Sequence, residues 1–340
     1  MTELWFYSGR VGNCMFMYAF TRLVGHMLGH KVNLPKGTEI TEFPLIKEDS
    51  KHVEVHDQKY TIGGPELLEC ARTVVNENDN MGWFIDPAFK GEPINSFSDL
   101  VTIKKIMNTP EVYRKWLVLL GNFEMGENYY PYRNILRNWF KFPEIDMTKF
   151  EFFKLHPELG KDNWFSRYEF NGEIHPDDLV ISLRLEDYTS PPNLDRLLDY
   201  DYFKIILESR KFNRVFIITN PGSIGHNNQY RYTKEFFPYD PIFVRIYDRP
   251  IMSMAFGAKF NNIAISQSTY SWWLAFLSHA KNIYYPLPKT GPFSITDKKY
   301  PMCDLRVPCS EFKYVDYETR TILPDDQYLK IDYENSSWKP

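Results

Sequence analysis

Short apolar runs alternate with helical spacing over the second half of the chain. Apolar runs typical of buried strands cover residues 179–183, 215–219, 243–246, 263–266 and 283–285. The spacing between them predicts helices over residues 202–210, 251–260 and 271–280. This alternation predicts a parallel α/β sheet with helices on both faces. Ligands on such sheets bind beyond the carboxyl ends of the strands.

The N-terminus predicts a strand, a glycine-containing loop and a helix. The apolar run 4–7 ends at Ser8-Gly9. Apolar residues then recur at steps of three and four from Met15 to Leu28, as in an amphipathic helix. Asn13 occupies the expected N-cap position and Gly29 the expected end.

Residues 30–175 have a less regular pattern. Strand-like pieces cover 53–55 and 101–103, and helical stretches cover 111–120 and 132–140. The proline-rich and aromatic character indicates long loops around a cleft. A length of 340 residues suits two domains, and we place them at residues 1–175 and 176–340.

Composition and charge narrow the class of protein. The chain is 43% hydrophobic and 25% charged, which is typical of a globular protein. Its net charge of −4, with no basic run, argues against nucleic-acid binding. Aromatic residues make up 17%, which suits either a sugar-binding cleft or an aromatic-rich core.

The four cysteines and the N-terminus bear on metal sites and location. Cys14, Cys70, Cys303 and Cys309 form no CxxC pair, so we expect no zinc site, although Cys303 and Cys309 are close enough in sequence to pair. We identify no signal peptide and no apolar run near the ~20 residues that span a bilayer. We therefore expect a cytoplasmic chain or a catalytic domain of a longer parent.

The first candidate site is the loop with Gly9, Gly12 and Asn13. Glycines between a strand and a helix let backbone N–H groups approach a ligand, and the helix start adds partial positive charge. This arrangement favours a diphosphate. The spacing matches neither G-x-G-x-x-G nor a P-loop, which disfavours nicotinamide and ATP sites. A tight turn alone is the other interpretation.

The second candidate follows the strand at 179–183. Arg184 lies at its carboxyl tip and is able to grip a phosphate and stabilise a leaving diphosphate. Glu186 or Asp187 beside it is a candidate base for an acceptor hydroxyl. An ion pair that closes the loop is the alternative.

The third candidate follows the strand at 263–266. It consists of four hydroxyl residues before a helix: Ser266, Ser268, Thr269 and Ser271. Hydroxyls and free N–H groups at a helix start form a neutral anion cradle that needs no metal. Helix capping by Ser271, with two core tryptophans, is the alternative. Asp248, after the preceding strand, either bonds a ribose or base edge or caps the next helix.

Three blocks of the sequence, residues 9–20, 265–277 and 285–288, resemble the α-1,2-fucosyltransferases of glycosyltransferase family 11. Residues 9–20, GRVGNCMFMYAF, are similar to the family's GGLGNQMFQYAF opening. Residues 265–277, ISQSTYSWWLAFL, are similar to its ISNSSFSWWGAWL block, and the Tyr-Pro-Leu-Pro at 285–288 resembles the Tyr-Pro-x-Pro that follows. Order and spacing agree across most of the chain.

This resemblance implies a GT-B-like fold of two Rossmann-like domains that face a cleft. It implies an inverting, metal-independent transferase that uses GDP-fucose and an oligosaccharide acceptor. The arginine of the family's HVRRGDY motif falls on Arg184 and its aspartate on Asp187. Its donor-site serines fall on Ser266, Ser268 and Ser271. Asp248 matches an acid of the wider fucosyltransferase group.

The chain also departs from that pattern. Ser182 replaces the motif's histidine, Leu185 its second arginine and Glu186 its glycine, and Thr219-Asn220-Pro221 stands where an acidic pair is expected. A transferase of the same fold with another nucleotide sugar is therefore an alternative, as is a non-catalytic glycan-binding module. The sequence indicates neither the acceptor nor the oligomeric state.

Overall fold

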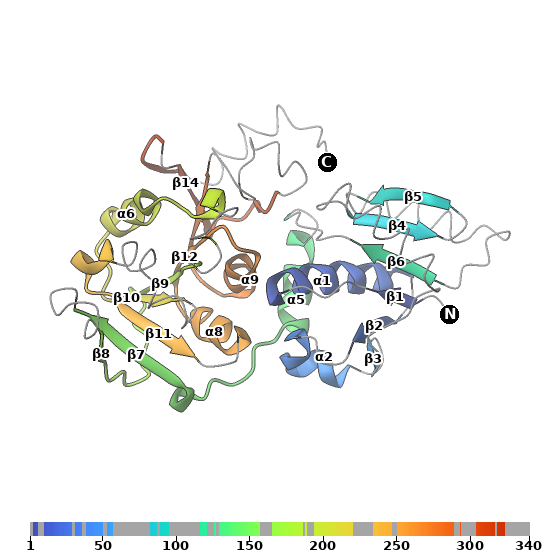
Figure 1. The fold of residues 1–340 in the computed structure, drawn as a ribbon, viewed down its shortest axis with the longest axis horizontal. Helices are drawn as coiled ribbons and strands as arrows, with labels where there is room; N and C mark the ends of the chain where they lie inside the picture. Colours follow the sequence, from blue (N-terminus) through green and yellow to red (C-terminus); the bar gives the residue numbers. More distant parts are fainter. Residues whose placement is uncertain are drawn as a thin grey trace. The chain divides into compact units, whose positions relative to one another are not determined.

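The chain divides into two compact units, each described here by itself. The structure, a computed structural model, describes residues 3–5, 10–28, 31–35, 39–49, 53–56, 82–86, 89–94, 116–120, 126, 129–156, 165–185, 188, 194–219, 234–246, 250–288, 293, 304–316 and 318–323. The first unit comprises Met1–Lys141 and Tyr300–Arg306, and the second comprises Phe142–Lys299 and Val307–Pro340 (Figure 1). No helix in these ranges is long and apolar enough to cross a membrane.

The division falls earlier than the boundary expected from the sequence. Residues 142–175 belong to the second unit and not to the N-terminal domain. The reason is strand β7 (Phe150–Leu155), which pairs antiparallel with β11 (Ile242–Ile246) and so extends the second sheet.

The first unit is built on a six-stranded sheet in the order β3-β2-β1-β6-β4-β5. Strands β3, β2, β1 and β6 run parallel, and β4 and β5 are antiparallel. The strands are β1 (Glu3–Trp5), β2 (Val32–Pro35), β3 (Val53–His56), β4 (Gly82–Asp86), β5 (Phe89–Ile94) and β6 (Trp116–Leu120). The helices are α1 (Val11–Leu28), α2 (Pro44–Glu48) and α5 (Arg133–Trp139), with 3-10 turns at Glu39–Glu42 and Tyr130–Tyr132.

Two expectations for this unit were wrong. Helix α1 begins at Val11, because the amide of Cys14 already donates to the carbonyl of Arg10 at 3.0 Å. Asn13 therefore lies inside the first turn and is not the N-cap. The expected helix over 111–120 contains the strand β6, whose five apolar residues pair with β1 on one side and β4 on the other.

The chain returns to the first unit near its end. The amide of Gly126 donates to the carbonyl of Asp304 at 2.6 Å. A Cβ atom at Gly126 would lie 2.5 Å from the backbone oxygen of Arg306, so only glycine allows this approach. The segment 300–306 is thus part of the first unit's packing.

The second unit is built on a nine-stranded sheet in the order β15-β14-β13-β12-β9-β10-β11-β7-β8. Besides β7 and β11, its strands are β8 (Phe165–Arg167), β9 (Leu179–Ser182), β10 (Val215–Ile218), β12 (Asn262–Ile265), β13 (Asn282–Pro286), β14 (Phe312–Asp316) and β15 (Thr321–Leu323). Its helices are α6 (Tyr200–Ser209), α8 (Pro250–Gly257) and α9 (Thr269–Leu277), with 3-10 turns at Met147–Lys149, Leu194–Arg196 and Phe237–Tyr239. The sequence predicted the elements from β9 to β13 and missed β7, β8, β14 and β15.

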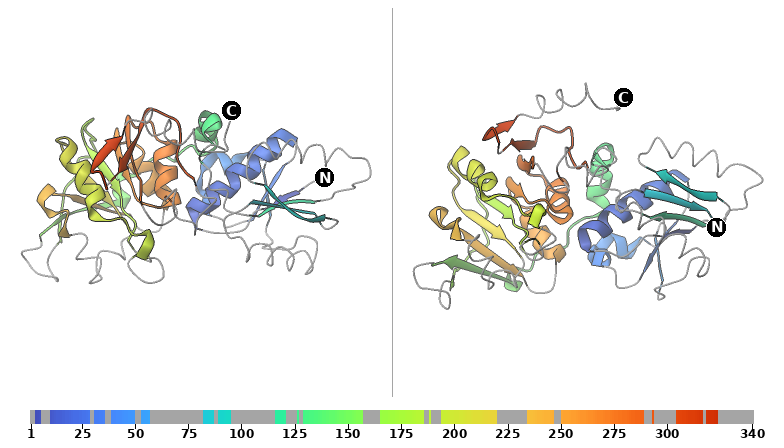
Figure 2. Two further views of the ribbon diagram at one scale, coloured as in Figure 1. Left: turned by 90° about the horizontal axis from the view of Figure 1, so that it is seen from above. Right: turned by 45° about the horizontal axis from the view of Figure 1, so that its top comes forward.

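The strands from β14 to β11 in this order are all parallel, as predicted. The chain adds β10 and β11 on one side of β9, then crosses back to place β12, β13 and β14 on the other. The topological switch point of the sheet therefore lies between the neighbouring strands β9 and β12. Helix α6 covers one face and α8 and α9 cover the other (Figures 1 and 2).

Aromatic side chains form much of the core beneath α8. Phe216 of β10 contacts Phe256 and Phe260, with ring centroids 6.2 and 5.1 Å apart, and Phe170 lies 5.3 Å from Phe216. Trp272 and Trp273 of α9 are fully buried. The buried aromatic residues among these are part of the core of the second unit. Cys309 is buried, and Cys303 lies outside the described residues.

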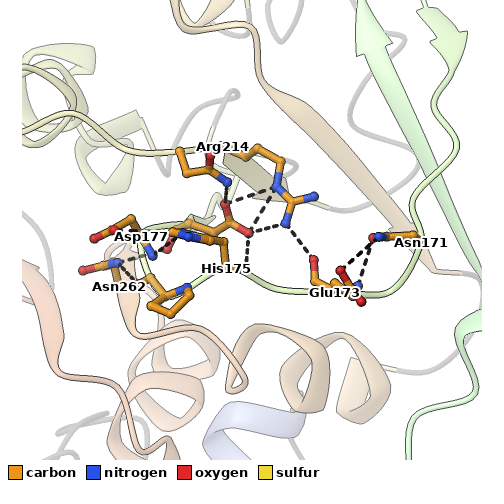
Figure 3. A network of polar contacts seen from close by, with 9 residues as sticks. Asn171, Glu173, His175, Asp177, Arg214 and Asn262 are labelled. Atoms are coloured by element: carbon orange, nitrogen blue, oxygen red, sulfur yellow. Dashed lines mark hydrogen bonds and ion pairs between the residues drawn. The ribbon is translucent and has the colours of Figure 1, made fainter.

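A buried ion pair lies at the amino ends of the central strands. The carboxylate of Asp178, fully buried, accepts from Nη2 of Arg214 at 2.6 Å, from Nδ2 of Asn213 at 2.8 Å and from the amide of His175 at 2.8 Å. Arg214 also donates to the carbonyl of Glu173 at 2.7 Å (Figure 3). The hydrogen bonds with Asp178 raise the pKa of Arg214 above its usual value.

The same network reaches two further strands through asparagine side chains. Nδ2 of Asn262 donates to the carbonyls of Pro176 and Asp178 at 3.0 and 3.1 Å, and Nδ2 of Asn282 donates to Oδ1 of Asn262 at 2.9 Å. These contacts connect the starts of β9, β12 and β13, next to the link with β10. Figure 3 shows Asn262 at this network. Each buried polar group is thereby hydrogen-bonded, which is the condition for burying it at low cost.

Replacing Asp178 with alanine tests this network. The change leaves Arg214 without its buried partner, so we expect the free energy of unfolding to fall by about 3–5 kcal/mol. Lys204→Ala is the control, because it breaks the exposed helical pair Lys204–Glu208 and should cost less than about 1 kcal/mol. Urea unfolding followed by circular dichroism measures both, and equal losses would contradict the role given to Asp178.

Candidate functional site

The carboxyl ends of β9 and β12 meet at the switch point. Strand pairing places Ser182, the last residue of β9, beside Ile265, the last residue of β12. Arg184 therefore follows one strand by two residues, while Ser266 directly follows its neighbour. Helix α9 begins three residues after Ser266. The segment with Arg184 after β9 and the serine segment before α9, two separate candidate sites in the sequence, thus lie side by side.

A group of serine hydrogen bonds joins the two strand ends. The carbonyl of Ser182 accepts from the amide of Ser266 at 3.2 Å and also from its hydroxyl. The hydroxyls of Ser182 and Ser271 lie 2.8 Å apart. All three serines are buried. Ser271 thus ties α9 to β9 and does not cap its helix, which corrects the capping interpretation.

The backbone of Arg184 is fixed by this serine group. Its amide donates to Oγ of Ser266 at 2.9 Å. Its guanidinium carbon lies 5.3 Å from the centre of the Tyr188 ring, and the hydroxyl of Tyr188 donates to the carbonyl of Gln267 at 3.0 Å. The side chain of Arg184 is half-buried at the edge of the sheet, where a cation is suited to an anionic ligand.

Ser268 is the N-cap residue of α9, yet its side chain makes no capping hydrogen bond. The residue is 6% exposed. Its amide donates to the carbonyl of Ser266 at 2.7 Å, so the backbone is held in place. A buried N-cap serine usually bonds an amide of its own helix. The Ser268 hydroxyl and the positive end of the helix dipole both belong to the start of α9, and helix starts of this kind bind anions in general.

Thr269 and Tyr270 complete the first turn of α9. Both are half-buried. The hydroxyl of Tyr270 donates to the carbonyl of Pro250 at 2.7 Å, and burial raises its pKa above the usual value. The Tyr270 hydroxyl thus serves as a hydrogen-bond donor to the backbone at the start of α8.

Leu185 explains one departure from the fucosyltransferase pattern. Its side chain is fully buried and belongs to the core cluster with Leu183 and Phe203. The position therefore points into the core in this chain, and an arginine there would be buried among apolar side chains. Within residues 182–185, Arg184 carries the only charge.

The remaining predicted site residues divide into two groups. Gly12 and Asn13 lie in the first turn of α1, in the first unit, with Gly12 buried and Asn13 half-buried. Gly9, Glu186, Asp187 and Asp248 lie outside the described residues. Tyr188 and Gln267 contribute to the site but were not predicted, because their role depends on contacts between segments about 80 positions apart.

A hollow of about 500 Å³ elsewhere in the second unit involves none of these residues. It is lined by Phe142, Pro143, Glu144, Ile145, Ala255, Ala258 and Lys259. Among the residues described, no group of three or more His, Cys, Asp or Glu side chains is placed to hold a metal ion.

Comparisons with known proteins give one remote likeness. No protein-family model matches the chain, and no curated protein matches it. Among solved structures, it is similar to a crystal structure of NodZ alpha-1,6-fucosyltransferase soaked with GDP-fucose, with a TM-score of 0.42 and 11% sequence identity. The alignment covers 83% of this chain and 93% of that chain. At this TM-score and identity the likeness is remote.

The two serines at the start of α9 should respond differently to replacement by alanine. Ser266→Ala removes bonds to Ser182 and Arg184, so the free energy of unfolding should fall by about 1–3 kcal/mol. Ser268→Ala removes no protein hydrogen bond and should change it by less than about 0.5 kcal/mol. Urea unfolding of the two variants checks this, and an equal loss for Ser268→Ala would show that its hydroxyl serves the fold.

Proposed function

We propose that this protein is an inverting glycosyltransferase that transfers L-fucose from GDP-fucose to a hydroxyl of a glycan acceptor. The observation that carries the proposal is the hydrogen bond from the Arg184 amide to Ser266. It joins two segments that resemble separate fucosyltransferase blocks, and it does so at the switch point of a parallel sheet, where nucleotides bind.

The proposed reaction is a single displacement at the anomeric carbon of the sugar. The acceptor oxygen forms a bond to that carbon while the carbon–oxygen bond to the diphosphate breaks. The bonding electrons leave with the diphosphate, and the acceptor proton passes to a base. Arg184 and the start of α9 supply positive charge where negative charge develops, which is the principal way to lower such a barrier.

The other roles stay as proposed from the sequence. Asp187 or Glu186 is the candidate base and Asp248 a candidate nucleotide contact. Gly9, Gly12 and Asn13 are a candidate diphosphate contact in the first unit. The α-1,2 linkage and independence of metal also belong to the proposal, because they come from the resemblance alone.

A transferase of the same fold with another nucleotide sugar is the second candidate. The observation that favours it is the buried Leu185, which leaves Arg184 as the only cationic residue of the segment 182–188. The hydroxyl of Ser182, in the position of the family's histidine, is occupied by Ser271. Both changes alter the polar groups that a donor would meet at this edge.

A panel of nucleotides in thermal-shift assays separates these candidates. At about 100 times its dissociation constant GDP should stabilise the native state by about 2.7 kcal/mol, which corresponds to a rise in Tm of roughly 5 °C. UDP and dTDP should give no comparable shift. Stabilisation by UDP or dTDP instead would favour the second candidate, and stabilisation by glycans without any nucleotide effect would favour a glycan-binding module.

Arg184→Ala tests the chemistry directly. The loss of a charge-assisted contact to the leaving diphosphate should lower the rate of GDP release from GDP-fucose by at least about 100-fold. The circular dichroism spectrum should be unchanged. Arg167→Ala is the matched control, since Arg167 is an exposed arginine on β8. Assays in EDTA address metal dependence, and near-normal turnover by Arg184→Ala would refute the assignment.

A further inference from the structure

Arg184 rests on an aromatic ring that is itself buried. The guanidinium carbon lies 5.3 Å from the ring centre of Tyr188, within the range of a cation–π contact. Tyr188 is only 8% exposed. Such a contact is stronger when it is removed from water, so this ring holds the cation more firmly than a surface tyrosine would.

The ring of Tyr188 is fixed from both ends. Its amide donates to the carbonyl of Leu185 at 2.7 Å, which closes a turn directly after Arg184. Its hydroxyl donates to the carbonyl of Gln267 at 3.0 Å. Gln267 is 1% exposed, and its side-chain oxygen accepts from the amide of Phe293 at 3.3 Å. The ring is therefore attached to a rigid part of the fold.

The neighbouring residues Ser266 and Gln267 therefore fix the backbone of Arg184 and the ring next to its guanidinium. Ser266 binds the backbone amide of Arg184, and Gln267 holds the ring beneath its guanidinium. Stacking uses the flat face of the guanidinium. In general the N–H donors of a guanidinium lie in its plane, and arginines recognise phosphate oxygens through these in-plane donors.

We propose that Tyr188 is a positioning residue that holds Arg184 in the orientation in which it binds the diphosphate of the donor. The inference rests on the proposed function of this site. A long arginine side chain loses rotamer freedom when it binds a ligand, and a platform that restricts it beforehand reduces that loss. Tyr188 itself need not touch the ligand.

The contribution of the ring is separated from that of the hydroxyl by two variants. Tyr188→Leu removes the ring, and we expect the dissociation constant for GDP to rise roughly tenfold, the size of a desolvated cation–π contact. Tyr188→Phe keeps the ring and should stay within about threefold of the wild type. Isothermal titration calorimetry with GDP and with guanosine measures both, and guanosine binding should be unchanged because it lacks phosphate.

The dependence on Arg184 is tested by a double-mutant cycle. If Tyr188 acts through Arg184, Tyr188→Leu should weaken GDP binding no further in an Arg184→Ala background. Tyr168→Leu is the matched control, because Tyr168 lies 5.3 Å from Nζ of Lys154 beside β7 and is remote from the switch point in the sheet order. It should leave GDP affinity unchanged.

The results that would overturn the inference are distinct from those that would overturn the function. Equal losses of GDP and guanosine, an additive effect in the Arg184→Ala background, or a loss in Tyr188→Phe as large as in Tyr188→Leu would each refute the positioning role. So would wild-type GDP affinity in a folded Tyr188→Leu variant. If Tyr188→Leu does not fold, Tyr188→Phe still tests the role, because a loss of GDP affinity well beyond about threefold in that variant would refute it. Failure of the unaltered protein to bind GDP or GDP-fucose would refute the proposed function and, with it, this inference.

Discussion

The buried carboxylate of Asp178 sets the alignment of the central strands in the second unit. Because it binds Arg214 and Asn213, the start of β10 is held level with the start of β9. Asn262 binds the backbone of the same segment and holds β12 level as well. The pairing Leu179 with Val215 and with Asn262 follows from these contacts. Three residues later along β9, the carboxyl ends are level too, and Ser182 lies beside Ile218 and Ile265.

That alignment places neutral hydroxyls and one cation at the opposite edge. Ser266 reaches Ser182 only because β9 and β12 end at the same height. A shift of one strand by one residue would turn Ser182 to the other face and separate it from Ser271. The position of Arg184 therefore depends on contacts at both the amino ends and the carboxyl ends of the central strands. The network around Asp178 and the geometry of the candidate site thus depend on the same register of β9, β10 and β12.

The sequence predicted the parallel core of the second unit because its strands are short, apolar runs with clear ends. The predicted ends of β9, β10 and β12 all lie within one residue of the observed ends. The prediction failed where local pattern and tertiary pairing disagree. Residues 116–120 have no alternation that distinguishes a buried strand from a helix, and only pairing with β1 and β4 decides between them.

The candidate site shows the same division between local and long-range information. The position of Arg184 after a strand, and of the serines before a helix, was readable from local pattern. The residues that hold these groups in place, Tyr188 and Gln267, were not predicted, because they contact each other only after the chain has folded. The inward direction of Leu185 likewise depends on a core built from distant strands and α6. Single residues were identified, while their connections required the structure.

The return of the chain to Gly126 has a consequence for synthesis on the ribosome. The first unit includes residues 300–306, and the amide of Gly126 is bonded to Asp304. Its last segment therefore leaves the ribosome only after most of the second unit has been made. Domains that are continuous in sequence complete their folding in the order of translation. Here residues 300–306 of the first unit and the strands β14 and β15 of the second are all made late, so a nascent chain carries both units unfinished until nearly all of it has been synthesised.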